Sequence, residues 1–98
     1  MVKGGQIMPY ISQEKRNANV ENLINLLYGY FTKALETHDF GTVNYILSKA
    51  IWLTFEKMPS YNNAREIKSV FYDIIHEFNR RKVDKYEDKK LKENGDII

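Results

Sequence analysis

Basic and aromatic residues recur close together in this 98-residue sequence, and they are the side chains best suited to bind a ligand. A guanidinium group binds phosphate through two parallel hydrogen bonds, and a tyrosine ring stacks on a nucleobase. The candidate ligand-binding residues are Tyr10, Lys15, Arg16, Asn44, Tyr45, Arg65, Arg80, Arg81 and Tyr86. If subunit interfaces bring these side chains together, they would hold a small phosphorylated nucleotide.

The run Arg80-Arg81-Lys82 has a second interpretation, which needs no ligand. It lies where the apolar pattern of the last expected helix ends, and cations near the C-terminus of a helix are stabilised by the helix dipole. The sequence leaves both interpretations open.

Residues suited to catalysis or metal binding are sparse. The chain has no cysteine, and its two histidines, His38 and His76, have no histidine or carboxylate three or four residues further on. The carboxylates are interspersed with lysine and arginine, as on a solvated helix surface. No glycine-rich phosphate loop is present, and no motif combines a nucleophile, a base and an oxyanion donor. We therefore predict a non-enzymatic protein that uses no metal and no cofactor.

The charge balance argues against duplex nucleic acid as a partner. The 15 basic and 13 acidic residues give a net charge of +2, although positive charge is concentrated between Arg80 and Lys92. No segment approaches the roughly 20 apolar residues that span a bilayer, and the N-terminus lacks the apolar core of a signal peptide. We expect a cytoplasmic protein of a bacterial host, with no membrane partner.

The first residues are unusual in that a second methionine, Met8, follows a Lys-Gly-Gly sequence. These three residues can be encoded by a bacterial ribosome-binding sequence just upstream of a start codon at Met8. We hypothesise that Met8 is the natural start. The expected organisation is then a disordered leader at residues 1–8 and a single helical domain at residues 9–98.

Apolar residues recur every three or four positions over most of the chain, which indicates amphipathic helices. The first expected helix is capped by Asn17 or Asn19 and ends near Thr37. The second runs from about Val43 to Lys57, with Thr42 as its cap. The third and longest runs from about Tyr61 to Val83 or beyond.

The second expected helix, residues 43–57, has almost no polar face. A helix that is apolar all round is buried on more than one side, so part of its surface is expected to meet another subunit. Its β-branched and aromatic residues also suit a strand, but its length and the lack of strict alternation favour a helix.

The predicted fold is all-α: a three-helix bundle or a helical hairpin with a long C-terminal helix. Seven tyrosines, five phenylalanines and one tryptophan exceed what the thin core of so short a chain requires. We therefore expect a homo-oligomer, the alternative being a monomer with half-exposed tyrosines.

Two motifs carry a family resemblance. Met8-Pro9-Tyr10-Ile11 near the start, and Tyr86-Glu87-Asp88 with Glu93-Asn94-Gly95-Asp96 near the end, resemble a widespread family of small uncharacterised proteins of phages, prophages and bacteria. The resemblance extends from Met8 to the C-terminus. The family carries no enzymatic assignment that could be transferred to this chain.

A second resemblance is to a helical phage sponge, a protein that sequesters cyclic-nucleotide immune signals. The long last helix of such sponges ends in a basic-apolar-acidic segment, a pattern matched here by Arg81, Val83 and Glu87. This resemblance implies a non-enzymatic phage protein that binds a nucleotide immune signal and so evades antiphage defence. The alternative is a structural or adaptor protein that binds a phage or host protein through its aromatic surface and charged C-terminal tail.

Overall fold

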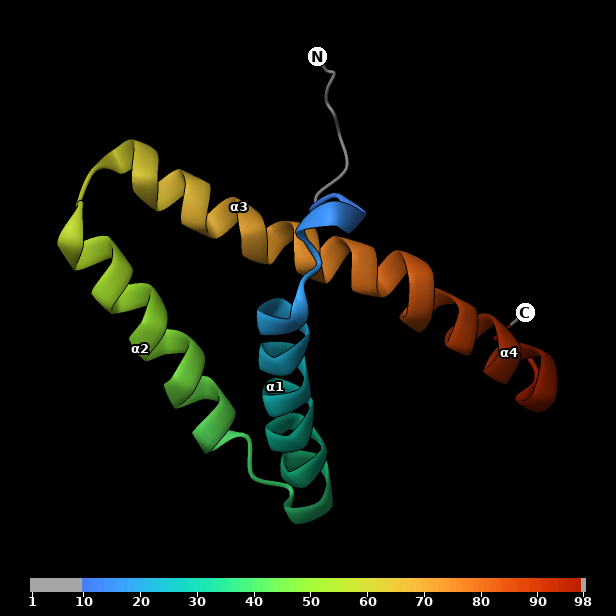
Figure 1. Cartoon of the computed structure of the whole chain (residues 1–98). Coiled ribbons are helices and arrows are strands. Elements are labelled where there is room, and N and C mark those ends of the chain that lie inside the picture. Colours follow the sequence, from blue (N-terminus) through green and yellow to red (C-terminus); the bar gives the residue numbers. More distant parts are fainter. Residues whose placement is uncertain (1–9, 98) are drawn as a thin grey trace. The chain divides into compact units, whose positions relative to one another are not determined.

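The computed structural model describes residues 10–97, and within that range the chain is helical with no strand (Figure 1). The elements in chain order are η1 (Gln13–Lys15), α1 (Ala18–Thr37), α2 (Gly41–Lys57), α3 (Tyr61–Phe78), η2 (Asn79–Val83) and α4 (Asp84–Asn94). The predicted all-α class and the long C-terminal helix are therefore confirmed. The predicted leader, residues 1–8, lies outside the described residues.

The chain divides into two compact units, Met1–Ser60 and Tyr61–Ile98. The first contains η1 and a hairpin of α1 and α2, and the second contains the continuous helix formed by α3, η2 and α4. That residues 9–98 form a single domain remains a prediction.

The start of α1 is fixed by a side-chain cap. Asn17 has an extended backbone conformation, and its Oδ1 accepts a hydrogen bond from the backbone N–H of Val20 at 3.1 Å. This bond satisfies one of the backbone donors that the first turn of a helix leaves unpaired. Of the two caps that the sequence allowed, Asn17 is thus the one used, and Asn19 lies inside the helix.

The turn between α1 and α2 places the start of the second helix two residues earlier than predicted. His38 ends α1 in the left-handed conformation, and its backbone N–H bonds to the Ala34 carbonyl. Asp39 Oδ1 then accepts from the Gly41 N–H at 2.9 Å. Thr42 is therefore not the cap, because the Asp39 carboxylate already holds the first helical N–H group.

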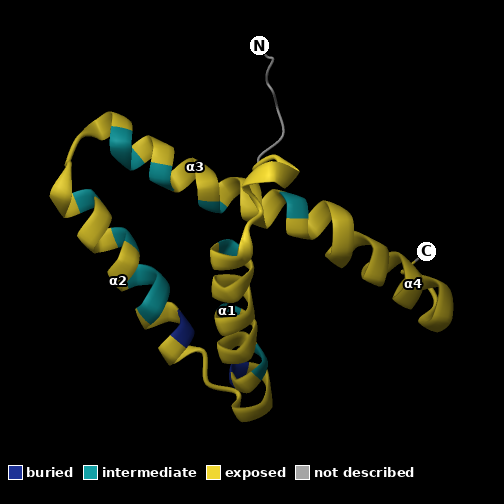
Figure 2. Ribbon diagram, in the orientation of Figure 1, coloured by how far each residue is buried: buried dark blue, intermediate teal, exposed yellow. Residues whose placement is uncertain are grey.

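Burial in the hairpin is concentrated next to this turn. Ala34 of α1 and Val43 of α2 are the two buried residues of the described chain (dark blue in Figure 2). They lie where α1 and α2 contact each other, close to the turn. The face of α2 that carries Val43 is therefore the inner face of the hairpin.

The second unit is one helix of 34 residues with a π-helical turn, η2, at its centre. At the end of this turn the N–H of Asp84 bonds to the carbonyl of Asn79, five residues earlier. A π-turn accommodates one more residue than a regular α-helical turn. The helix ends at Gly95, whose φ of 87° is readily adopted by glycine and whose N–H bonds to the Leu91 carbonyl.

The π-turn keeps the apolar residues before it and after it on the same side of the long helix. In a regular α-helix, Val83 would lie about 140° around the axis from Phe78, five residues earlier. Because the π-turn takes up the extra residue, Val83 and then Tyr86 stay close to the face that carries Phe78. This explains why the apolar pattern of the sequence continues less regularly beyond Phe78.

The cap of α1 gives a direct test of the hairpin. Replacing Asn17 by alanine should lower the free energy of unfolding by about 1 kcal/mol, because the Val20 N–H loses its acceptor. Asn19→Ala is the matched control and should not destabilise, since alanine favours the interior of a helix. Urea unfolding followed by circular dichroism measures both. Equal effects of the two substitutions would contradict the assigned cap.

Candidate functional site

The outer face of α2 carries a shallow groove with a volume of about 510 Å³. Its residues recur every three or four positions, as the neighbours on one side of a helix do. They are Phe40, Gly41, Asn44, Tyr45, Ser48, Lys49 and Trp52. Tyr45 and Trp52 lie about 180° around α2 from the buried Val43, so this aromatic groove faces away from the hairpin interior.

The groove is apolar with a few polar groups placed along it. Tyr45 and Trp52 are 66% and 65% exposed, which is unusual for residues of this size. Between them, the Ser48 hydroxyl donates to Asn44 Oδ1 at 2.9 Å. Among the described residues that line the groove, Lys49 is the one with a cationic side chain. The surface can therefore bury rings or apolar side chains and orient them with an amide, a hydroxyl and an ammonium group.

A smaller cavity of about 320 Å³ lies at the hairpin turn, lined by residues of both helices. Two of its polar side chains, Thr37 and Asp39, make local hydrogen bonds at the turn. Thr37 Oγ1 donates to the Lys33 carbonyl at 2.9 Å, and Asp39 Oδ1 accepts from the Gly41 N–H. We therefore assign this cavity to the structure of the turn.

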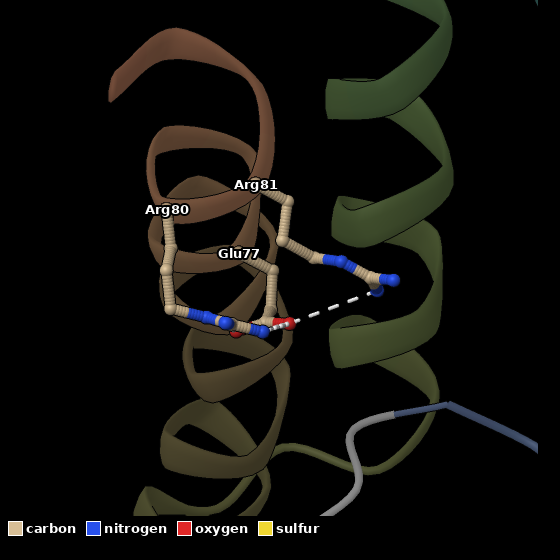
Figure 3. A network of polar contacts seen from close by, with 3 residues as sticks. All are labelled: Glu77, Arg80 and Arg81. Carbon is tan, nitrogen blue, oxygen red and sulfur yellow. Dashed lines mark hydrogen bonds and ion pairs between the residues drawn. The ribbon is translucent and has the colours of Figure 1, made fainter. Parts of the chain in front are cut away.

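The predicted phosphate-binding pair, Arg80 and Arg81, lies in the π-turn and faces a carboxylate (Figure 3). Arg80 donates from Nε and Nη2 to the two oxygens of Glu77, each at 3.0 Å. Arg81 Nη1 lies 3.9 Å from Glu77 Oε1. One negative charge thus sits between two positive ones, which weakens this cluster as an anion site.

The same contacts lower the pKa of the Glu77 carboxyl below its ordinary value. The largest cause is the hydrogen bonding from Arg80, and the charges of Arg80 and Arg81 act in the same direction. Hydrogen bonds to the ionised form of an acid favour that form. Glu77 therefore remains negative beside the two arginines at neutral pH.

The other candidates of the second unit also have partners on their own helix. Arg65 Nη2 donates to Asn62 Oδ1 at 3.2 Å. The Lys90 ammonium lies 5.7 Å from the centre of the Tyr86 ring, within the range of a cation–π contact. Arg65 and Arg80 are separated by about 22 Å along the helix, so they cannot bind one phosphate together within a chain.

The remaining candidates belong to the first unit. Arg16 Nη2 donates to the Ile11 carbonyl at 3.3 Å, next to the short helix that ends with Lys15, and Tyr10 is exposed just before that helix. Asn44 and Tyr45 are the two predicted residues that line the aromatic groove. Within each unit, the structure thus brings the candidates together only in small groups.

Sequence reasoning missed Phe40, Lys49 and Trp52 as site residues. The spacing of Tyr45, Lys49 and Trp52 was a readable signal, since steps of four and three residues place them on one side of a helix. The sequence could not show that this side is the outer one, because the whole helix is apolar.

Residues 10–97 contain neither a cluster suited to a metal ion nor a helix suited to a membrane. No three or more His, Asp or Glu side chains lie close enough there to hold a metal ion. None of the described helices combines the length and the apolar character that crossing a membrane requires.

Fold and site together define a small all-α protein with an exposed aromatic groove on one helix and a basic π-helical turn in another. The chain belongs to the family described as Domain of unknown function (DUF6899), whose family model matches residues 8–97. Comparison with curated proteins and with solved structures finds no match. The predicted membership of an uncharacterised family is thus confirmed at the level of the family, while the two motifs that suggested it remain predictions.

The Glu77 network predicts a measurable asymmetry between the two arginines. Arg80→Gln should raise the pKa of Glu77 clearly, because it removes both hydrogen bonds at 3.0 Å. Arg81→Gln should raise it less, since Arg81 lies 3.9 Å away. Carboxyl ¹³C chemical shifts followed against pH give the pKa in each variant. A larger effect of Arg81→Gln would contradict the geometry.

The sign of the pH dependence follows from the direction of the shift. Because the folded pKa of Glu77 is lowered, the pair stabilises the helix fully above the unfolded-state pKa of glutamate. That stabilisation is lost as the pH falls through the folded pKa. The acid loss of helicity should therefore be shallower in Glu77→Gln than in the parent chain.

Proposed function

We propose that this chain is a non-enzymatic binding protein that recognises a protein partner through the aromatic groove of α2. The observation that carries the proposal is the exposure of Tyr45 and Trp52 on one side of a helix whose opposite side is buried at Val43. Tryptophan and tyrosine are the residues most enriched where interfaces derive their binding energy. An adaptor role of this kind needs no chemistry at the site.

Covering the groove offers enough free energy to hold a partner. A fully buried aromatic side chain removes about 150–250 Å² from water, so a ring that is two-thirds exposed still offers roughly 3 kcal/mol. Two such rings outweigh the lower estimates of the entropy cost of association, about 4 kcal/mol. The groove therefore suits a compact partner segment that covers both rings.

The residues that line the groove also indicate which side chains the partner segment would carry. Its apolar walls call for apolar or aromatic side chains, spaced to reach Tyr45 and Trp52. Lys49, between these rings, favours a carboxylate on the partner, and the Asn44–Ser48 pair favours a polar group beside it. We infer a helical or extended segment with two apolar anchors and an acidic residue.

Site-specific photo-crosslinking in the native cells tests this proposal. A benzophenone amino acid at Tyr45 should give a discrete adduct with another protein, identified by mass spectrometry. The same group at Tyr28 of α1 is the matched control, because Tyr28 is 68% exposed and lies outside the groove. Trp52→Ala should abolish the Tyr45 adduct, since loss of a central aromatic anchor weakens binding more than about tenfold.

Two outcomes would overturn the adaptor function. One is that the photoreactive group forms the same crosslinked products at position 28 as at position 45. The other is a Tyr45 adduct formed only with a second copy of the chain, which would make the groove an interface between subunits.

A second candidate function is sequestration of a small phosphorylated nucleotide, such as a phage sponge performs. It is favoured by one observation: Asn44 and Tyr45, both predicted to bind a base, line the same groove as Lys49 and Trp52. A base could stack on the rings while its phosphate meets the ammonium group of Lys49. Such a protein would hold an immune signal intact and act stoichiometrically.

Trp52 provides the readout for this alternative, because it is the only tryptophan and lies in the groove. Cyclic dinucleotides, cyclic trinucleotides, cyclic ADP-ribose isomers, ATP and NAD are titrated while tryptophan emission is recorded. If the groove binds nucleotides, one class should quench the emission, and Lys49→Ala should weaken that effect. Arg80→Ala with Arg81→Ala should leave it unchanged. If quenching were lost only in the arginine variant, the nucleotide site would lie at the π-turn. If no nucleotide quenched the emission, binding of these nucleotides at the groove would be excluded.

A further inference from the structure

The long helix of the second unit carries an apolar stripe along one side. Its members are Ala64, Ile67, Phe71, Ile74, Ile75, Phe78, Val83 and Tyr86. Ile74 is 52% exposed and Phe78 is 59% exposed. The described residues of this unit form no second element against which the stripe could pack. A helix with an exposed apolar stripe of this length requires a partner that covers the stripe.

We propose that this stripe pairs antiparallel with the same stripe of a second copy of the chain. The proposal rests on the second unit alone and is independent of the function assigned to the groove of α2. The partner contributes the same residues in reverse order, as a two-fold axis requires.

The spacing of the stripe is self-complementary. From Ala64 to Tyr86, counting Ile74 and leaving out Ile75, successive members are three, four, three, four, five and three residues apart. The five-residue step spans the π-turn and is equivalent to four in an α-helix. In the reverse direction, from Tyr86 to Ala64, Ile75 is counted and Ile74 is left out. With the step across the π-turn counted as four, both directions give three, four, three, four, four and three residues.

Two antiparallel copies therefore place matching residues opposite each other. Ala64 meets Tyr86 of the other copy, Ile67 meets Val83, and Phe71 meets Phe78. Ile74 and Ile75 meet across the two-fold axis. Steps of three and four residues are the pattern that packs helices along a continuous seam. The π-turn is needed for the match, because without it Val83 and Tyr86 would leave the stripe.

Charge favours the antiparallel orientation over the parallel one. Residues 61–78 carry two basic and three acidic side chains, whereas residues 79–94 carry seven basic and four acidic ones. A parallel pair would set the two basic halves side by side. An antiparallel pair sets each basic half against the slightly acidic half of the other copy, and like-charge juxtaposition is avoided.

The absence of cysteine makes the orientation directly measurable. Two single-cysteine variants, Ile67→Cys and Val83→Cys, are prepared with tags of different mass. They are mixed and oxidised mildly with glutathione disulfide. Antiparallel pairing should give the mixed disulfide dimer and neither homodimer, because the two copies of residue 67 would be separated by about 24 Å.

Ser69→Cys mixed with Val83→Cys is the matched control, since Ser69 lies about 160° around the helix from Phe71 and should not crosslink. Circular dichroism checks that each variant stays helical, and sedimentation of the parent chain should show a dimer or a larger even-numbered assembly. Crosslinking of Ile67→Cys with itself would show parallel pairing and overturn the proposal. So would a monomeric parent chain without crosslinks.

Discussion

The need to remove apolar surface from water governs this protein, and the described chain buries such surface fully only beside the turn of its hairpin. Ala34 and Val43 are buried there, whereas the large apolar side chains on the outside of α2 and along the long helix are not. Burial of such groups is the main favourable term in folding and association. The groove and the stripe are two separate surfaces that still expose apolar side chains to water. Both proposals start from that exposure.

Most of the fold could be read from the sequence because it depends on local rules. The three-and-four spacing identified the helices, and the side-chain chemistry of asparagine limited the cap of α1 to Asn17 or Asn19, of which the structure uses Asn17. The start of α2 was missed because Asp39, not Thr42, holds the first helical N–H. The π-turn was visible only as a break in the pattern after Phe78, since sequence periodicity alone does not tell an irregular helix from the end of a stripe.

The site was harder to predict because it depends on which surfaces remain uncovered. Arg80 and Arg81 had the right chemistry for phosphate, but Glu77 lies three and four residues before them and meets both. That spacing was legible in the sequence. Trp52 was hidden for a different reason. A helix that is apolar all round gives no sign of which side packs inward, and only the position of Val43 in the hairpin decides it.

The π-turn has a consequence for how this family can vary in length. Removing one residue between Asn79 and Val83 would allow a regular α-helix there, at no cost in backbone hydrogen bonds. Because five residues across the π-turn are equivalent to four in an α-helix, the residues that follow would keep their direction around the helix axis. Tyr86 and the charged segment behind it would then stay on the sides of the helix that they occupy now. The π-turn is thus a place where the long helix can lose one residue without changing which side of its C-terminal half carries the apolar stripe.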